Sequence, residues 1–243
     1  MRLVHIESEH HFSLVEFTGQ AIPPYAILSH TWGPDHEEVT FQELSDGTGL
    51  SKAGYDKIQF CGRQAANYSL QYFWIDTCCI DKISSAELTE SINSMFIWYK
   101  EAAVCYVLLM DLPANARLEM DLPNCRWFTR GWTLQELIAP ERVILFDQSL
   151  VSIGSKGYLV EELSCITGIE EDVLNGEDLA LSSVAVRMRW AASRQTKRIE
   201  DRAYSLLGMF DVSIPLIYGE GRKAFRRLQE EIIKRDNDLT RFA

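Results

Sequence analysis

Short, nearly continuous apolar runs alternate with segments of helical periodicity over the first two-thirds of the chain, and this alternation restricts the fold more than any other feature. Apolar runs without polar alternation are typical of strands that are covered on both faces, as in parallel sheets. The predicted strands are 25–30 (YAILSH), 72–77 (YFWIDT), 104–111 (VCYVLLMD), 142–147 (RVILFD) and a weaker one at 150–153. The pattern therefore predicts an α/β fold with a parallel sheet flanked by helices.

Helices are predicted between these strands and throughout the rest of the chain. Within the first part, apolar residues recur at steps of three and four in 51–70, 87–103 and 129–138. Ser84 and Ser85 are candidate N-caps for the second of these, and Pro140 ends the third. After residue 155 the apolar runs stop, and helical patterns occupy 158–165, 170–175, 181–194, 199–209 and 220–235. We therefore expect an α/β core at 1–155 and a helical extension at 156–243 that packs on it.

Composition and charge exclude several classes of protein. The 243 residues are 47% hydrophobic and 24% charged, which is ordinary for a globular protein. No apolar run approaches the ~18 residues that a membrane span needs, and the start of the chain does not resemble a secretory signal. The net charge of −11 argues against non-specific binding to nucleic acid or membranes. We expect a cytoplasmic protein with reduced, mostly buried cysteines.

Polar residues at the carboxyl ends of the predicted strands are the first candidates for a site, because open parallel sheets bind ligands there. The first two strands contribute Ser29, His30, Trp32, Gly33, Asp76 and Cys79. Trp32 offers a flat face for stacking a ring, and Gly33 permits a sharp turn. The alternative is that these groups only cap the sheet.

A second candidate cluster is the segment 126–137 (RWFTRGWTLQEL). Trp132 and Glu136 are four residues apart and share a helix face, whereas Leu134, Leu137 and Ile138 are expected to point into the core. A glutamate beside a tryptophan near the strand ends is partly desolvated, so its pKa is expected to rise. The alternative is a surface glutamate paired with an arginine, either Arg130 or Arg142.

Other chemistries have weaker support in the sequence. A cysteine protease would combine Cys78 or Cys79 with His30 and Asp76, but no helix start is predicted that would activate the thiol. The cysteines and histidines lack the short spacings of a zinc site, so no metal is expected. No glycine-rich phosphate loop follows a strand, which argues against kinase or GTPase chemistry.

Five blocks of sequence, in order, resemble the signature blocks of fungal HET (heterokaryon incompatibility) domains. They are YAILSHTWG at 25–33, WIDTCCID at 74–81, RGWTLQEL at 130–137, EDRAYSLLG at 200–208 and IYGEG at 217–221. The resemblance covers about residues 22–235, nearly the whole chain. It implies a role in programmed cell death during non-self recognition, as in the N-terminal domains of NLR-type fungal proteins.

A second and more distant resemblance is to TIR domains, and it concerns the mechanism. The order of elements is similar, and segment 131–137 followed by strand 143–146 resembles the TIR segment that carries the catalytic glutamate. The resemblance gives Glu136 that role. It also implies NAD+ as the substrate, with Trp32 or Trp132 stacking on a ring and Arg130 meeting the diphosphate. No bound cofactor is implied, since NAD+ is consumed. The helical extension departs from TIR domains, which lack it.

Three functions remain open on the sequence. The first is an NAD+ hydrolase that kills when it forms homo-oligomers. The second is a non-enzymatic module that self-assembles and recruits partners, and the third is a domain that senses a nucleotide without turnover. The resemblance also implies that nucleotide-binding and WD-repeat domains follow in the full-length protein. The first two hypotheses differ at Glu136, because only the enzyme needs its carboxylate.

Overall fold

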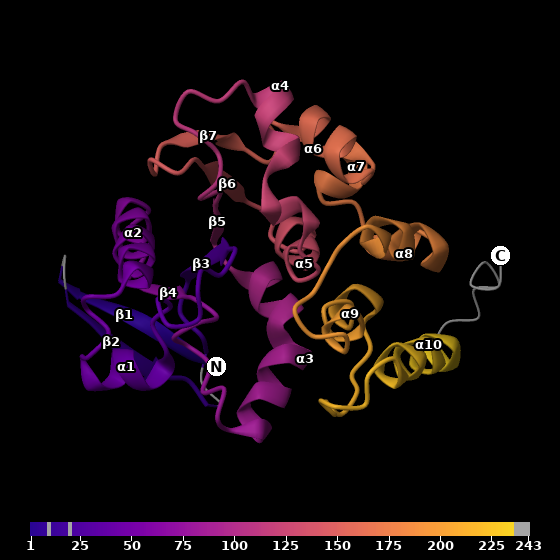
Figure 1. Ribbon diagram of the computed structural model, residues 1–243, viewed down its shortest axis with the longest axis horizontal. Coiled ribbons are helices and arrows are strands. Elements are labelled where there is room, and N and C mark those ends of the chain that lie inside the picture. The colour runs from indigo at the N-terminus through magenta and orange to yellow at the C-terminus, as the bar shows by residue number, and fades with distance from the viewer. Residues whose placement is uncertain (9–10, 19–20, 236–243) are drawn as a thin grey trace.

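The computed structural model describes residues 1–8, 11–18 and 21–235, and within them the chain builds a seven-stranded sheet (Figure 1). The strands are β1 (Arg2–Ser8), β2 (His11–Glu16), β3 (Tyr25–His30), β4 (Tyr72–Trp74), β5 (Val104–Leu108), β6 (Val143–Phe146) and β7 (Ser152–Ser155). Their order across the sheet is β2-β1-β4-β3-β5-β6-β7.

The four central strands are parallel, as the continuous apolar runs predict. Ala26 of β3 lies opposite both Phe73 of β4 and Val104 of β5, and β5 pairs in parallel with β6. All six residues of β3 are buried. The order β4-β3-β5-β6 is that of flavodoxin-like and TIR-like sheets, in which the chain reverses direction across the sheet beside the first parallel strand. The predicted α/β, TIR-like fold is therefore confirmed.

Two of the central strands are shorter than their apolar runs. Ile75 and Leu109 are both buried, yet their carbonyls accept from local turns: Cys79 N donates to Ile75 O (2.9 Å) and Leu112 N to Leu109 O (3.1 Å). Leu109 N still donates to Phe146 O of β6 (2.9 Å), so strand pairing ends within this residue. The predictions 72–77 and 104–111 were too long because hydrophobicity reports burial and not the end of strand pairing.

Both edges of the sheet are antiparallel, and one of them, the β1–β2 hairpin, was not predicted. β1 and β2 form a hairpin that joins the sheet where Val4 pairs with Phe73. At the other edge, β7 pairs with β6 and begins two residues later than predicted. Leu150 has a φ of 63°, and Asp147 Oδ1 accepts bonds from the backbone N–H groups of Ser149 and Val151. This turn occupies the first half of the predicted strand.

Helices of the first part cover both faces of the central strands. They are α1 (Phe41–Asp46), α2 (Ala53–Asn67), α3 (Ser85–Glu101), α4 (Leu118–Asp121), the 3-10 turns η1 (Leu122–Asn124) and η2 (Arg126–Thr129), and α5 (Thr133–Ile138). Figure 1 shows α2 on one side of these strands and α3 and α5 on the other. Ser84 caps α3 by accepting from Glu87 N, as predicted. The predicted helix 129–138 is divided because Gly131 N donates to Gln195 O instead (2.8 Å).

The C-terminal helices pack beside α3 and α5. They are α6 (Val160–Thr167), α7 (Glu171–Leu174), η3 (Leu179–Leu181), α8 (Val184–Ala192), α9 (Asp201–Tyr204), η4 (Gly208–Phe210) and α10 (Lys223–Arg235). All five predicted helical segments are helical, although 199–209 splits into α9 and η4. In Figure 1, α8 to α10 lie on the far side of α3 and α5 from α1 and α2. Asn93 of α3 exchanges two hydrogen bonds with the backbone of Ile214, which ties the two parts together.

Candidate functional site

A cavity of about 350 Å³ opens beyond the carboxyl ends of β3 and β4, beside the point where the strand order reverses. This size is in the range of small-molecule sites, and the position is the one that open α/β sheets use. Its lining comes from four places along the chain: the residues after β3 and β4, one face of α3, the start of α5, and the segment around α9. The lining residues used below are His30, Trp32, Asp35, Asp76, Lys82, Arg130, Trp132, Thr133, Glu136, Lys197, Arg198, Asp201 and Tyr218.

Glu136 of α5 is the buried carboxylate of this cavity, and only 7% of the residue is exposed. Ser29 at the end of β3 donates its hydroxyl hydrogen to Glu136 Oε2, and Trp127 Nε1 donates to Ser29 Oγ (2.8 Å). Trp132 and Glu136 both line the cavity, as their predicted common helix face requires, whereas Leu134, Leu137 and Ile138 are buried and do not line it. The alternative of a surface glutamate paired with Arg130 or Arg142 is wrong.

Burial raises the pKa of Glu136 to about 8. The Ser29 hydrogen bond opposes this rise, whereas the negative charge of Asp76 adds to it. Near neutral pH the group is therefore largely a neutral acid that a modest change of environment converts to a carboxylate. A pKa that burial and a second carboxylate move this far within a cavity is a mark of a functional group.

Arg194, from the segment after α8, is the arginine that acts on Glu136. Its guanidinium is buried and donates to Arg130 O (2.9 Å) and to Thr133 Oγ1 (3.0 Å), one turn before Glu136. Its charge lowers the pKa of Glu136, and burial lowers the pKa of Arg194 itself to about 10. The C-terminal part of the chain thus contributes one charge to the electrostatics of a carboxylate on the sheet part, although burial has the largest effect on its pKa.

Trp32 and Asp76 form a joined pair on the wall of the cavity. Trp32 Nε1 donates to Asp76 Oδ2 (2.8 Å), which fixes the indole ring after β3 against the end of β4. Lys82 Nζ lies 3.7 Å from the centroid of the Trp32 ring, a cation–π contact. The ring therefore stands at a defined angle, with a cation on one face.

A buried carboxylate, Glu38, holds the loop that follows β3. Its Oε1 accepts from Gly33 N (2.7 Å) and from Lys57 Nζ, and its Oε2 lies 3.8 Å from His30 Nε2. Burial raises the pKa of Glu38, but His30 and then Lys57 outweigh it and bring the pKa to about 2. Glu38 is therefore ionised, and Gly33 serves as its backbone donor outside the cavity lining.

The segment around α9 builds the opposite wall. Asp201 is 8% exposed, accepts from the Tyr218 hydroxyl (3.0 Å), and has a pKa that burial raises. Arg198 lies over the Tyr218 ring, 4.4 Å from its centroid. Asp201 and Tyr218 belong to the two later sequence blocks, so those blocks form part of the cavity wall.

The structure brings six of the nine predicted site residues to the cavity: His30, Trp32, Asp76, Arg130, Trp132 and Glu136. Ser29 lies behind Glu136, and Gly33 bonds to Glu38. Cys79 is buried, and its sulfur accepts from Ile75 N (3.4 Å), away from the cavity. Sequence reasoning missed Lys82, Lys197, Arg198, Asp201 and Tyr218; the recurring blocks at 200–208 and 217–221 were the available signal for the last two.

The described residues form neither a cysteine-protease site nor a metal-binding site. The six cysteines are free. The hydrogen bond with Cys79, and then burial, raise the pKa of the Cys78 thiol well above its usual range, which disfavours the thiolate that a protease needs. No group of three or more His, Cys, Asp or Glu side chains in the described parts of the chain is arranged to hold a metal ion.

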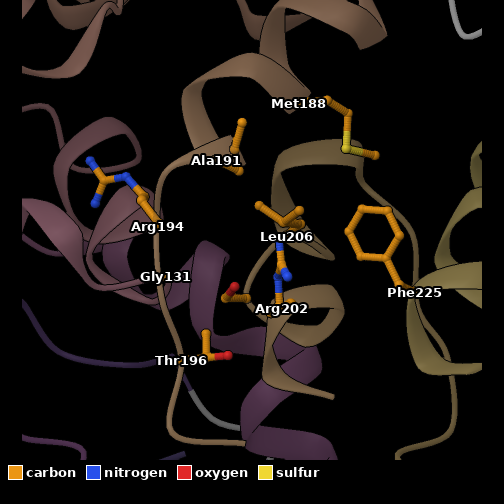
Figure 2. A pocket seen from close by; sticks show the side chains of 10 residues that line it. Gly131, Met188, Ala191, Arg194, Thr196, Arg202, Leu206 and Phe225 are labelled. Carbon is orange, nitrogen blue, oxygen red and sulfur yellow. The ribbon is translucent and has the colours of Figure 1, made fainter. Parts of the chain in front are cut away.

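Two other hollows lie among the C-terminal helices. Figure 2 shows a small one of about 50 Å³ between Gly131, α8, Leu206 and Phe225 of α10; Arg194 points away from it. It is too small for a nucleotide and is a packing gap. A hollow of about 880 Å³ lies between α3, the η3 turn and η4, and its buried cation Arg187 already donates to Met209 O (2.8 Å). Neither lies at the ends of parallel strands.

The fold and the cavity together define the class of protein. It is a TIR-like α/β domain with a buried carboxylate at the ends of its parallel strands, and its C-terminal part supplies one wall of the cavity. Among the described residues no helix is long and apolar enough to cross a membrane.

Comparison with known proteins identifies the family. The profile of the family described as "Heterokaryon incompatibility protein (HET)" matches residues 25–123. "Vegetative incompatibility protein HET-E-1" of Podospora anserina is 53% identical over 226 residues, which are 90% of this chain and 17% of that protein. No solved structure is significantly similar. The chain belongs to the HET family, and it spans about a sixth of the length of this relative.

Proposed function

We propose that this domain is a cell-death effector of fungal non-self recognition and that it cleaves NAD+ between nicotinamide and ribose. Family membership supports the first part, because the matching relative is a vegetative incompatibility protein. One observation carries the second part: a buried carboxylate, Glu136, whose pKa is raised to about 8, lines a cavity of about 350 Å³ at the ends of parallel strands.

The chemistry suits a single carboxylate. When the bond between ribose C1′ and the nicotinamide nitrogen breaks, the electron pair leaves with nicotinamide and positive charge develops on the ribose. A carboxylate in a site shielded from water stabilises that charge, as in glycoside cleavage. Water then adds to C1′ and releases a proton, which gives ADP-ribose, nicotinamide and H⁺. In this scheme Glu136 acts in its ionised form.

Ligand binding supplies the means to ionise Glu136. The nicotinamide ring of NAD+ carries a positive charge, and a cation beside a carboxylate lowers its pKa. We therefore expect kcat/KM to rise with pH through about 8, the pKa in the free protein, and kcat to rise at a lower pH.

The remaining residues have binding and positioning roles in this proposal. Trp32 and Trp132 offer ring faces to the dinucleotide, and Arg130 is placed for its diphosphate. Ser29 positions Glu136 through its hydrogen bond. We also propose that the domain acts as a homo-oligomer in the cytoplasm, joined to nucleotide-binding and WD-repeat domains of a longer protein.

The test is NAD+ loss with nicotinamide release, followed by chromatography, at high protein concentration with a crowding agent. We expect turnover by the wild type, a loss of at least about a hundredfold in Glu136→Gln, and full activity in Glu230→Gln. Glu230 makes the matched control because its exposed side chain pairs with Arg226 on α10.

Circular dichroism must show that Glu136→Gln keeps its fold. If neither protein releases nicotinamide while the wild type still kills cells on expression, the enzymatic proposal is wrong. A non-enzymatic module that works by self-assembly then explains the killing.

A further inference from the structure

Four cationic side chains line the cavity of a protein whose net charge is −11. They are Lys82, Arg130, Lys197 and Arg198. Lys82 comes from the loop before α3, and Lys197 and Arg198 come from the segment before α9, more than a hundred residues later. Four acidic side chains line the cavity too: Asp35, Asp76, Glu136 and Asp201. Glu136 is largely neutral near pH 7 and Asp76 accepts from Trp32, so the cations that gather from separate segments at the rim are the groups that could meet an anionic ligand.

Lys82 is the most distinctive of the four. Its ammonium group lies against the Trp32 ring, and it takes part in no ion pair among the described residues. The indole that supports it is fixed by its bond to Asp76 (2.8 Å). The charges of Asp76 and Asp35 act on Lys82 without a close ion pair to either, so this lysine, held on an aromatic face beside the cavity, is available to an incoming anion.

Lys197 lies across from the loop after β3, where Asp35 faces both lysines. Lys197 Nζ is 2.5 Å from Asp35 Oδ2, and the pKa of Asp35 is lowered first by Lys197 and also by the charge of Lys82. Both side chains of the pair are mostly exposed, at 63% and 69%. An exposed ion pair contributes little stability, so Lys197 can exchange Asp35 for another anion at small cost.

Arg198 is the neighbour of Lys197, and its guanidinium carbon lies over the Tyr218 ring, 4.4 Å from the centroid. A guanidinium in a cation–π contact still has N–H donors that can meet two phosphate oxygens. Tyr218 is itself fixed by its bond to Asp201. Both walls of the cavity rim thus present a cation on an aromatic platform.

We propose that Lys82, Lys197 and Arg198 form a phosphate-binding subsite at the rim and that Asp35 competes with the ligand phosphate for Lys197. This proposal deepens the proposed function and rests on its ligand class: the ligand is a nucleotide with a diphosphate bridge. It also gives the C-terminal part a direct role, because two of the three cations come from it.

The test is calorimetric binding of two probes, ADP-ribose and adenosine, to the folded protein carrying Glu136→Gln. ADP-ribose has the diphosphate and adenosine has none. We expect Lys82→Gln and Arg198→Gln each to weaken ADP-ribose binding about tenfold and to leave adenosine binding unchanged. Asp35→Asn should strengthen ADP-ribose binding several-fold, since it removes the competing carboxylate.

Matched controls are Lys234→Gln and Arg189→Gln, whose exposed cations pair with Glu231 and Glu170 outside the cavity. Opposite effects of Lys82→Gln and Asp35→Asn cannot arise from a general loss of structure. Equal weakening of both probes by Lys82→Gln, or no binding of ADP-ribose to any variant, would overturn the subsite. Because ADP-ribose contains no nicotinamide, the subsite can be upheld even if NAD+ proves not to be cleaved.

Discussion

Glu136 illustrates how burial at a single residue couples stability to activity. Burial raises the pKa of Glu136 most, hydrogen bonds from Ser29 and Tyr99 oppose the rise, the charge of Asp76 adds to it, and the net result is a pKa of about 8. The folded protein thus holds a proton on Glu136 that the unfolded chain releases at its ordinary pKa of 4.5. The proposed reaction needs the ionised carboxylate of Glu136, and burial in the folded protein disfavours that ionised form.

The free energy of unfolding therefore depends on pH through Glu136. A group whose folded pKa lies above its unfolded pKa contributes its full stability below about pH 4.5 and loses it as the pH rises through about 8. The loss is about 1.4 kcal/mol for each unit by which the two pKa values differ. We expect the unfolding free energy of the wild type to fall relative to that of Glu136→Gln across this window.

Urea denaturation of both proteins at several pH values measures this difference. Glu230→Gln again serves as the control, because an exposed glutamate adds no comparable slope. A wild-type curve that runs parallel to the Glu136→Gln curve from pH 5 to 8 would show that Glu136 is already ionised in the folded protein.

At the scale of elements, the two late sequence blocks form one unit. Glu200 Oε1 accepts from the backbone N–H groups of both Gly219 and Gly221, each at 2.9 Å. These glycines have φ values of 97° and 62°, which L side chains rarely adopt. The contact folds the chain back so that Tyr218 reaches Asp201. The two blocks are therefore joined in the folded chain and together build one wall of the cavity.

Gly208 is the point where this unit meets α3. A Cβ added at Gly208 would fall well inside van der Waals contact with the Cβ of Phe96, an atom that no rotamer change can move. We expect Gly208→Ala to destabilise the protein by about 1–3 kcal/mol and to lower its Tm by several degrees. Calorimetry measures the shift.

The control for this change is Gly157→Ala, where an added Cβ meets nothing within 4 Å. Its Tm should stay within about a degree of the wild type, since nothing is displaced. If Gly208→Ala also left the Tm unchanged, the packing of η4 on α3 would be looser than the structure shows.

The elements that sequence patterns predict well are those whose signal is local. The four parallel strands, the cap at Ser84 and the phase of the helix that carries Glu136 all follow from residues within one segment. The hairpin of β1 and β2 gives no such signal, because at a sheet edge most of its residues, such as His5 and Phe12, are only partly covered.

The site residues also differ in whether their signal is local in the sequence. Trp32, Asp76 and Glu136 stand at strand ends or on a helix face, where sequence position alone indicates a site. Lys82 and Arg198 look like ordinary exposed cations in the sequence. Their role depends on contacts with Trp32 and Tyr218 that only the folded chain creates.

In the whole molecule, the contacts between the sheet part and the C-terminal helices decide whether the two fold as one unit. Bonds between them are short and numerous around α5, where Gly131 N donates to Gln195 O (2.8 Å) and Gln195 N to Thr129 O (2.7 Å). One continuous cluster of buried apolar residues extends from Leu3 to Ile232. The predicted boundary near residue 155 therefore separates two kinds of architecture that share one core.

We accordingly expect one cooperative unfolding transition. Calorimetry, tryptophan fluorescence and far-ultraviolet circular dichroism should give the same midpoint, although chains of this size often unfold in steps. Asn93→Ala supplies the critical comparison, because it removes both bonds to Ile214 and leaves a backbone N–H and C=O without these partners. We expect a loss of about 1–3 kcal/mol, with the single transition moving to lower temperature. If Asn93→Ala instead splits the transition in two, the C-terminal helices are a separate unit, and their part of the cavity is assembled by docking rather than by folding.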